Sequence, residues 1–209
     1  MRDMIELSKA PIIASHSSAR ALCNHSRNLD DEQLEWLKEN GGVVQTVAFR
    51  TYLNTEKSEK YREVIQSTID DLAAENNFEL MPRDEVMKLD TEKQNEYWTT
   101  YRDIRSEARK IVDKIPGLPV DVADFVNHID YLVEKIGLQH VGISSDFDGG
   151  GGVYGWNDAS ETLNVTAELV KRGYSEAEIE QLWSGNLLRV LDEVDKVAKE
   201  IQELESKDI

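Results

Sequence analysis

The residues of this sequence best suited to chemistry stand just after short apolar runs. His16 follows the first such run, and Asp146 and Asp148 follow a later run at 140–145. A histidine at such a position can bind a metal ion or transfer a proton, and so can a pair of acids. Arg27 lies eleven residues after His16. Its guanidinium could bind a carboxylate through two parallel hydrogen bonds.

Each of these residues also has a purely structural interpretation. His16 could be a hydrogen-bonded histidine that caps its strand, and Arg27 could form a surface ion pair. Asp146 and Asp148 could cap a loop. Spacing alone leaves these alternatives open. Of the other histidines, His128 lies beside the apolar face of a helix and is predicted to be structural.

The elements that position these residues follow a strand-helix-strand order. Strands are predicted over 11–15, 43–49 and 140–145, and Asp30 with Gln33 forms the capping box of an intervening helix. This order predicts parallel pairing, which places the carboxyl ends of the strands at one edge. We therefore expect the polar residues that follow the strands to line one active-site mouth.

The two acids after the third strand are separated by one residue. Alternate side chains of an extended segment point the same way, so Asp146 and Asp148 are predicted to lie on one side. Geometry alone therefore does not choose between them.

The composition excludes several classes of function. The chain has 209 residues and a net charge of -17, and it lacks the Lys and Arg clusters that bind nucleic acid or anionic membrane surfaces. Cys23 is the single cysteine, so an intrachain disulfide is excluded. The sequence has no apolar run of the ~20 residues that a membrane span needs. We expect no membrane span and no signal peptide in this chain.

Residues 55–115 interrupt the strand-helix alternation and are predicted to form a helical insertion that packs on its own domain. Within it, apolar side chains recur at alternating steps of four and three residues, which is typical of an amphipathic helix. These side chains are Tyr97, Tyr101, Ile104, Ala108, Ile111 and Ile115. Further helices are expected near 159–172, 175–183 and 186–204.

Several ordered motifs together resemble the membrane (renal-type) dipeptidases, metallopeptidase family M19. The segment 13–20, Ile-Ala-Ser-His-Ser-Ser-Ala-Arg, with Arg27-Asn28 resembles one motif of that family, and 141–149 resembles the motif of its last strand. Residues 172–176 and 185–190 resemble its closing helices. The resemblance covers 10–55 and 119–197.

The resemblance implies a (β/α)8 TIM-type barrel with two zinc ions that hydrolyses dipeptides. His16 matches a ligand of the second zinc, Arg27 matches the residue that binds the carboxylate of the substrate, and Asp146 matches the acid/base. The metals of such a site polarise the scissile carbonyl and lower the pKa of a bridging water. The fold class expected here is α/β, as the helix-rich C-terminal part of that barrel. We expect residues 1–209 to form a single partial barrel domain with the insertion at about 55–115.

The sequence departs from the family pattern on the metal ligands. The family's His-x-Asp pair, its bridging glutamate and two further histidines have no match here. A zinc ion takes about four ligands, and His16 is one. A closed barrel needs eight strands and ~250 residues, whereas three strands are predicted.

Two hypotheses follow. In the first, the chain is the C-terminal part of a zinc dipeptidase, inactive alone, whose N-terminal half lies in a longer parent chain or a partner. In the second, it is a non-catalytic partial barrel that acts through protein contacts, including a homo-oligomer, because an unclosed barrel exposes strand edges. Localisation is open; the protein would be periplasmic or secreted if a parent chain carries a signal peptide.

Overall fold

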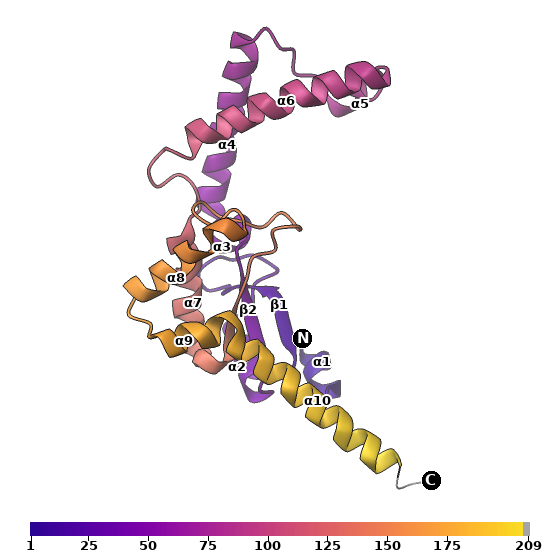
Figure 1. Ribbon diagram of the computed structural model, residues 1–209, viewed down its shortest axis with the longest axis vertical. Helices are drawn as coiled ribbons and strands as arrows, with labels where there is room; N and C mark the ends of the chain where they lie inside the picture. The colour runs from indigo at the N-terminus through magenta and orange to yellow at the C-terminus, as the bar shows by residue number, and fades with distance from the viewer. Residues whose placement is uncertain (207–209) are drawn as a thin grey trace. The chain divides into compact units, whose positions relative to one another are not determined.

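The computed structural model describes residues 1–206 as a helix-rich α/β structure with a small parallel sheet (Figure 1). The chain divides into two compact units. The first unit combines residues 1–55 with the segment from 120 onward, and the second is Glu56–Pro119. Within residues 1–206, none of the helices has the length and apolar character needed to cross a bilayer.

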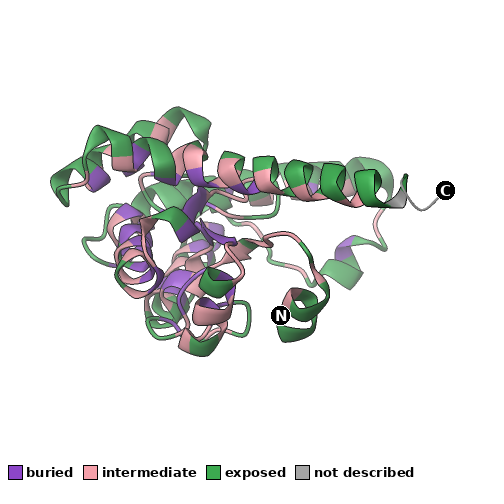
Figure 2. Cartoon of the chain, turned by 90° about the horizontal axis from the view of Figure 1, so that it is seen from below, coloured by how far each residue is buried: buried purple, intermediate pink, exposed green. Residues whose placement is uncertain are grey.

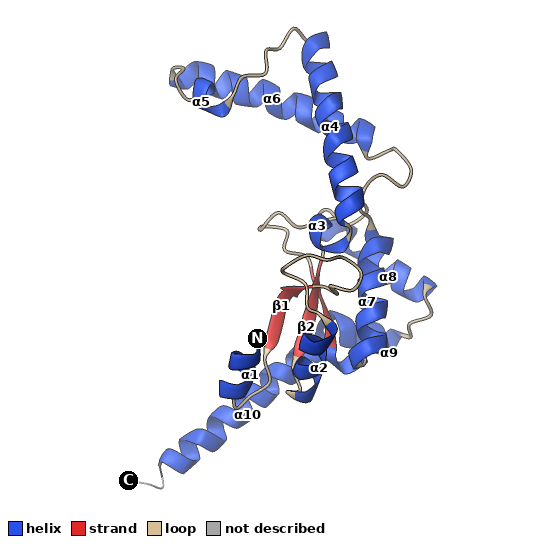
Figure 3. Cartoon of the chain, turned by 180° about the vertical axis from the view of Figure 1, so that it is seen from behind, coloured by secondary structure: helices blue, strands red, loops and turns tan. Residues whose placement is uncertain are grey.

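The first unit holds the three strands and most of the shorter helices. Its elements are α1 (Arg2–Leu7), β1 (Ile13–Ser17), α2 (Asp31–Glu39), β2 (Val43–Val47), α3 (Arg50–Leu53), α7 (Val122–Ile136), η1 (Leu138–His140), β3 (Val141–Ser144), η2 (Ala159–Glu161), α8 (Thr162–Lys171), α9 (Glu176–Glu180), η3 (Gln181–Gly185) and α10 (Asn186–Glu205). Figure 3 shows the strands lying side by side, with helices of the same unit around them.

The strands pair in the order β1-β2-β3, and both pairings are parallel. The sequence predicted the parallel pairing but not the strand order, and β1 covers Ile13–Ser17 rather than 11–15. All five residues of β2 are buried. The core of the unit joins apolar side chains of the sheet to those of α2, α7, α8 and η3, with Phe125 and Trp156 among its largest members.

Capping residues set where the main helices begin. Asp30 caps α2 and Gln33 returns a hydrogen bond to the cap, as the sequence predicted. Asp121 and Asp124 form the same reciprocal arrangement at the start of α7. Gly137 ends α7 with a φ of 90°, a left-handed conformation that favours glycine.

The final helices differ from the prediction of two separate elements. The helix from Glu176 continues through a π-helical segment, η3, directly into α10. At this junction the amide of Asn186 donates to the carbonyl oxygens of Leu138 and Val141, each at 2.7 Å. Its side chain therefore fixes the start of α10 against the amino end of β3.

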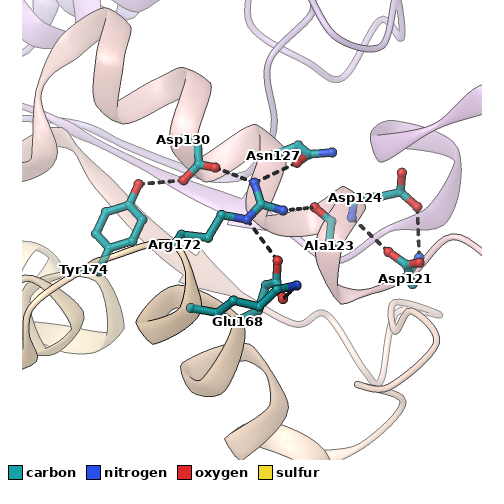
Figure 4. A network of polar contacts seen from close by, with 9 residues as sticks. Asp121, Ala123, Asp124, Asn127, Asp130, Glu168, Arg172 and Tyr174 are labelled. Carbon is teal, nitrogen blue, oxygen red and sulfur yellow. Dashed lines mark hydrogen bonds and ion pairs between the residues drawn. The ribbon is translucent and has the colours of Figure 1, made fainter.

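A polar network joins α7 to the end of α8 (Figure 4). The guanidinium of Arg172 donates to carboxylate oxygens of Asp130 and Glu168, and the hydroxyl of Tyr174 donates to Asp130 at 2.9 Å. Burial, together with this bond to a carboxylate, raises the pKa of Tyr174. The hydroxyl therefore stays protonated and available as a donor.

The second unit is helical. It contains most of α4 (Thr55–Glu75), together with α5 (Arg83–Val86) and α6 (Thr91–Val112). Ile69 and Ala73 of α4 pack against Ile104 and Ala108 of α6. The apolar side chains predicted to share one face of α6 are buried only in part. Ile111 and Ile115 are exposed. The helix ends at Val112, which is buried in their place.

His128 of α7 connects the loop after β1 to the end of α3. Its Nδ1 accepts a hydrogen bond from the backbone N–H of Ala19 at 3.1 Å, and its Nε2 lies 2.9 Å from the carbonyl oxygen of Leu53. Because Nδ1 accepts, Nε2 carries the proton and donates to Leu53. Burial lowers the pKa of His128, so the side chain is neutral and structural, as the sequence predicted.

We expect His128 to make the stability of the protein depend on pH. The unfolded chain binds the extra proton more readily, so the contribution of His128 is complete above ~pH 6.5 and is lost as the pH falls below that value. Urea unfolding of the wild type and of His128→Gln at about pH 8 and about pH 5 measures this. The stability advantage of the wild type should shrink at the lower pH; equal advantages at both would contradict this explanation.

Candidate functional site

The parallel sheet brings His16 and Asp146 together at the carboxyl ends of its strands. His16 lies in β1, Asp146 follows β3, and β2 lies between these two strands. Nε2 of His16 is 3.6 Å from Oδ1 of Asp146. The side chains remain 42% and 27% exposed, so solvent or a ligand can reach both. The sequence predicted polar residues at the ends of these strands, and the structure adds that His16 and Asp146 lie next to each other.

A register irregularity in β1 lies between Ala14 and Ser17, the stretch that contains His16. Ile13 pairs with Val43 and Ser17 pairs with Thr46, so β1 uses one residue more than β2 over the same stretch. An extra residue in a strand changes the direction of the side chains around it. Nδ1 of His16 also lies 2.8 Å from the hydroxyl of Ser15. Together the irregularity and this contact set the direction of the imidazole.

Asp146 adopts a backbone conformation that is rare for residues other than glycine, with a φ of 53°. Its carbonyl oxygen accepts hydrogen bonds from the N–H groups of Gly149 at 3.0 Å and Gly151 at 2.7 Å. A Cβ atom at Gly149 would collide with the Asp146 carboxylate, and one at Gly151 would collide with the backbone at Ser145. The two glycines are therefore needed for the turn that holds this carboxylate.

This turn overturns the prediction that Asp146 and Asp148 share one side of an extended segment. The chain turns at Asp146, and Asp148 is exposed. Between them, the ring of Phe147 packs edge-on against Trp156 with 5.4 Å between centroids. The aromatic contact anchors the turn to the core. Asp146 is thus the acid that faces His16.

Arg27 lies in a loop fixed by its neighbour Asn28. The side chain of the buried Asn28 accepts from the N–H of Ser18 and donates to the carbonyl oxygens of Cys23 and Tyr52. The Arg27 side chain is exposed, and within residues 1–206 its guanidinium makes no hydrogen bond or ion pair. The structure therefore places Arg27 on an ordered loop after β1 but shows no contact between it and the His16–Asp146 pair.

An aromatic stack beside Arg27 was not predicted from the sequence. The ring of His25 stacks on Tyr52 at 4.2 Å, and Tyr52 stacks on Phe49 at 4.7 Å. The Nδ1 atom of His25 also accepts a hydrogen bond from the N–H of Arg27. Phe49 and Tyr52 lie at the start of α3, after β2, whereas His25 lies in the loop after β1. The contact of His25 with Tyr52 joins distant segments, so no local sequence pattern predicts it.

The described residues do not by themselves fit a zinc ion. His16 and Asp146 offer one imidazole and one carboxylate, whereas zinc in proteins takes about four ligands. Among the residues that the structure describes, no group of three or more His, Cys, Asp or Glu side chains is arranged to hold a metal. The pair can bind a polar ligand or exchange a proton, but it is not a complete metal centre.

Comparison with known proteins assigns the chain to a family. The sequence profile described as membrane dipeptidase (peptidase family M19) matches residues 1–205. The chain is 29% identical to dipeptidase aclJ of Aspergillus oryzae over 96% of its own length and 34% of that relative. It is 31% identical to dipeptidase ataJ of Aspergillus terreus over 94% of its length and 34% of that relative. The chain thus spans about a third of the length of these relatives.

Two solved structures have a similar fold. The probable dipeptidase PvdM of Pseudomonas aeruginosa is 39% identical, with a TM-score of 0.63 over 93% of this chain and 48% of that one. A metallopeptidase of Rhodobacter sphaeroides, liganded with a phosphinate mimic of the dipeptide L-Ala-D-Ala, is 22% identical with a TM-score of 0.60 over 92% of this chain and 38% of that one. This second likeness concerns the fold alone. With a family profile matched over nearly the whole sequence, the chain belongs to the membrane dipeptidases, peptidase family M19.

Proposed function

We propose that this chain is the C-terminal part of a zinc-dependent dipeptidase with a (β/α)8 barrel. His16 is a metal ligand, Arg27 binds the substrate carboxylate, and Asp146 is the acid/base. The observation that carries the proposal is the 3.6 Å approach of His16 to Asp146 at the carboxyl ends of the strands, where barrel enzymes have their active sites. The dipeptidase relatives support a dipeptide substrate.

The sheet supports the partial barrel. In the described part of the chain, β1 and β3 each pair on one side only, so each leaves an outer edge where a further strand can be added. We propose that these edges pair with strands outside the described residues, which also supply the remaining metal ligands and the residues of the first half of the site.

This chain would contribute two functions to the reaction: Asp146 transfers protons, and Arg27 binds the carboxylate of the substrate. The carboxylate of Asp146 can take a proton from an attacking water and return it to the leaving amine, as a general base and then a general acid. The fixed turn around Asp146 holds the carboxylate in place for both steps. The guanidinium of Arg27 forms two parallel hydrogen bonds to the terminal carboxylate of a dipeptide, which explains a preference for short substrates.

The isolated chain should not hold two zinc ions, because His16 is its one matched ligand. Metal analysis of chelator-treated and zinc-reconstituted protein gives the number bound per chain. Two tightly bound zinc ions per chain would show that the described residues form the site alone, contrary to the proposal.

The role of Asp146 can be tested in a complete barrel, made by placing this chain after the N-terminal part of the Pseudomonas aeruginosa relative. We expect that barrel to hydrolyse dipeptides, and Asp146→Asn to lower kcat by ~10²-fold. Asp148→Asn is the matched control and should cost much less, because Asp148 lies outside the contact with His16. Rates at saturating dipeptide, with zinc content measured in each variant, decide the question. An active Asp146→Asn beside an inactive Asp148→Asn would reverse the assignment, and a metal-loaded barrel without dipeptidase activity would contradict the function.

The same barrel tests Arg27. Arg27→Lys replaces a planar fork by a point charge, so we expect a higher KM for dipeptides and weaker discrimination against substrates with an amidated C-terminus. Steady-state kinetics on matched free-acid and amide substrates measures both effects. Unchanged kinetics on the two substrates would show that Arg27 does not bind the carboxylate.

A further inference from the structure

The loop that carries Arg27 is closed at its base by a pair of backbone hydrogen bonds. The N–H of Arg20 donates to the carbonyl oxygen of Leu29 at 2.8 Å, and the N–H of Leu29 donates to the carbonyl oxygen of Ser18 at 2.9 Å. Leu29 is buried and belongs to the core of the first unit. Residues 20–28 therefore form a loop whose two ends are fixed next to each other.

The guanidinium of Arg20 binds this loop on both sides of Arg27. Its Nη2 donates to the carbonyl oxygen of Asn28 at 2.6 Å and, at a longer 3.4 Å, to the carbonyl oxygen of Ser26. These are the residues just after and just before Arg27. Its Nη1 donates to a carboxylate oxygen of Asp30 at 2.9 Å. One side chain thus joins both neighbours of Arg27 to the start of α2.

Asp30 gives these contacts a rigid support. Its other carboxylate oxygen accepts a hydrogen bond from the N–H of Gln33 as the N-cap of α2, and Leu34 and Leu37 of that helix lie in the core. The side chains of Arg20 and Asp30 are 30% and 42% exposed, so solvent screens their attraction and the ion pair adds little stability. The main effect of the contact is to fix the direction of the loop.

The two arginines of this loop differ in what they leave free for a ligand. Both terminal nitrogens of Arg20 are bonded to the loop or to Asp30. The guanidinium of Arg27 is exposed and makes no hydrogen bond or ion pair with a described residue. This division indicates that one arginine holds the loop while the other meets the ligand.

We propose that Arg20 is a positioning residue for Arg27. By holding the carbonyl groups on either side, it directs the Arg27 guanidinium toward the carboxylate of the substrate. The inference rests on the proposed function, because it requires that Arg27 binds this carboxylate. Two parallel hydrogen bonds form only when the planar fork is correctly oriented, and a fork oriented in advance loses less freedom on binding. Loss of Arg20 should therefore weaken substrate binding and leave proton transfer by Asp146 unchanged.

Kinetics in the complete barrel made with the Pseudomonas aeruginosa relative test this role. We expect Arg20→Gln to raise the KM for free-acid dipeptides by ~10-fold, the scale of one lost charge-assisted hydrogen bond, with little change in kcat. The KM for the matched amides should rise less. Because Arg20 acts through Arg27, adding Arg20→Gln to Arg27→Lys should change the KM little further. Arg20→Lys keeps the charge without the fork, so its KM should fall between those of the wild type and Arg20→Gln.

Arg189 provides the matched control. It also donates from Nη1 and Nη2 to backbone carbonyl oxygens, those of Gly41 and Gln139, which lie before β2 and β3 at the opposite ends of these strands. It lies near the start of α10, between the buried Asn186 and Val190, and Figure 2 shows that exposed positions predominate along the later turns. Arg189→Gln should therefore lower the stability in urea but leave the KM for dipeptides unchanged.

A second measurement on the 209-residue chain requires no activity. Nitrogen relaxation should give the backbone N–H of Arg27 an order parameter of about 0.85 in the wild type and below about 0.6 in Arg20→Gln. Arg189→Gln should match the wild type.

Several results would overturn the inference. These are a rigid Arg27 backbone in Arg20→Gln, a normal KM in both Arg20 variants, a KM effect that simply adds to that of Arg27→Lys, and an equal rise of KM in Arg189→Gln. Unchanged kinetics of Arg27→Lys in an active barrel would instead contradict the carboxylate role of Arg27, and this inference would fall with it. An affected Arg27→Lys beside normal Arg20 variants would contradict this inference alone.

Discussion

Parallel pairing of three short strands is the constraint on which the rest of the first unit depends. It places the carboxyl ends of β1 and β3 on either side of the end of β2, and the side chains of His16 and Asp146 meet there at 3.6 Å. Local features then set the direction of each side chain. β1 has an extra residue between Ala14 and Ser17, and the backbone of Asp146 is left-handed, with its carbonyl oxygen bonded by the N–H groups of Gly149 and Gly151. Strain of this kind persists where the surrounding structure enforces it, and it is common at functional sites.

Contacts between distant segments keep the strand ends in place. His128 joins the loop after β1 to α3, and Asn186 joins α10 to the amino end of β3. The Arg172 network holds α7 against the end of α8. His128 and Asn186 bond buried groups from segments far apart in sequence, so loss of either side chain leaves buried polar groups without partners.

The sequence predicted the features that depend on local patterns. The alternation of apolar strands and capped helices predicted the parallel pairing and the cap of α2 at Asp30. Contacts between distant residues were not predictable. The segment with Asp146 and Asp148 was expected to be extended, but it forms a turn. This turn requires Gly149 and Gly151 to lie very close to Asp146 and Ser145, which the sequence pattern does not indicate. The end of α6 was also missed, because burial of Val112 in place of Ile111 depends on how the helices of the second unit pack. The roles of His16, Arg27 and Asp146 rest on resemblance to the family, and the contact between His16 and Asp146 is a finding of the structure.

The convergence of the two strand ends can be measured in solution by nuclear Overhauser contacts. In protein with selectively protonated His and Asp side chains, the contact of His16 with Asp146 should give a cross-peak between the ring protons of His16 and the β protons of Asp146. It predicts none between His16 and Asp148, which is exposed beyond the turn. Loss of the cross-peak in Asp146→Asn samples prepared without protonated Asn would confirm its assignment. A spectrum in which His16 contacts Asp148, or neither acid, would contradict the arrangement of the strand ends described above.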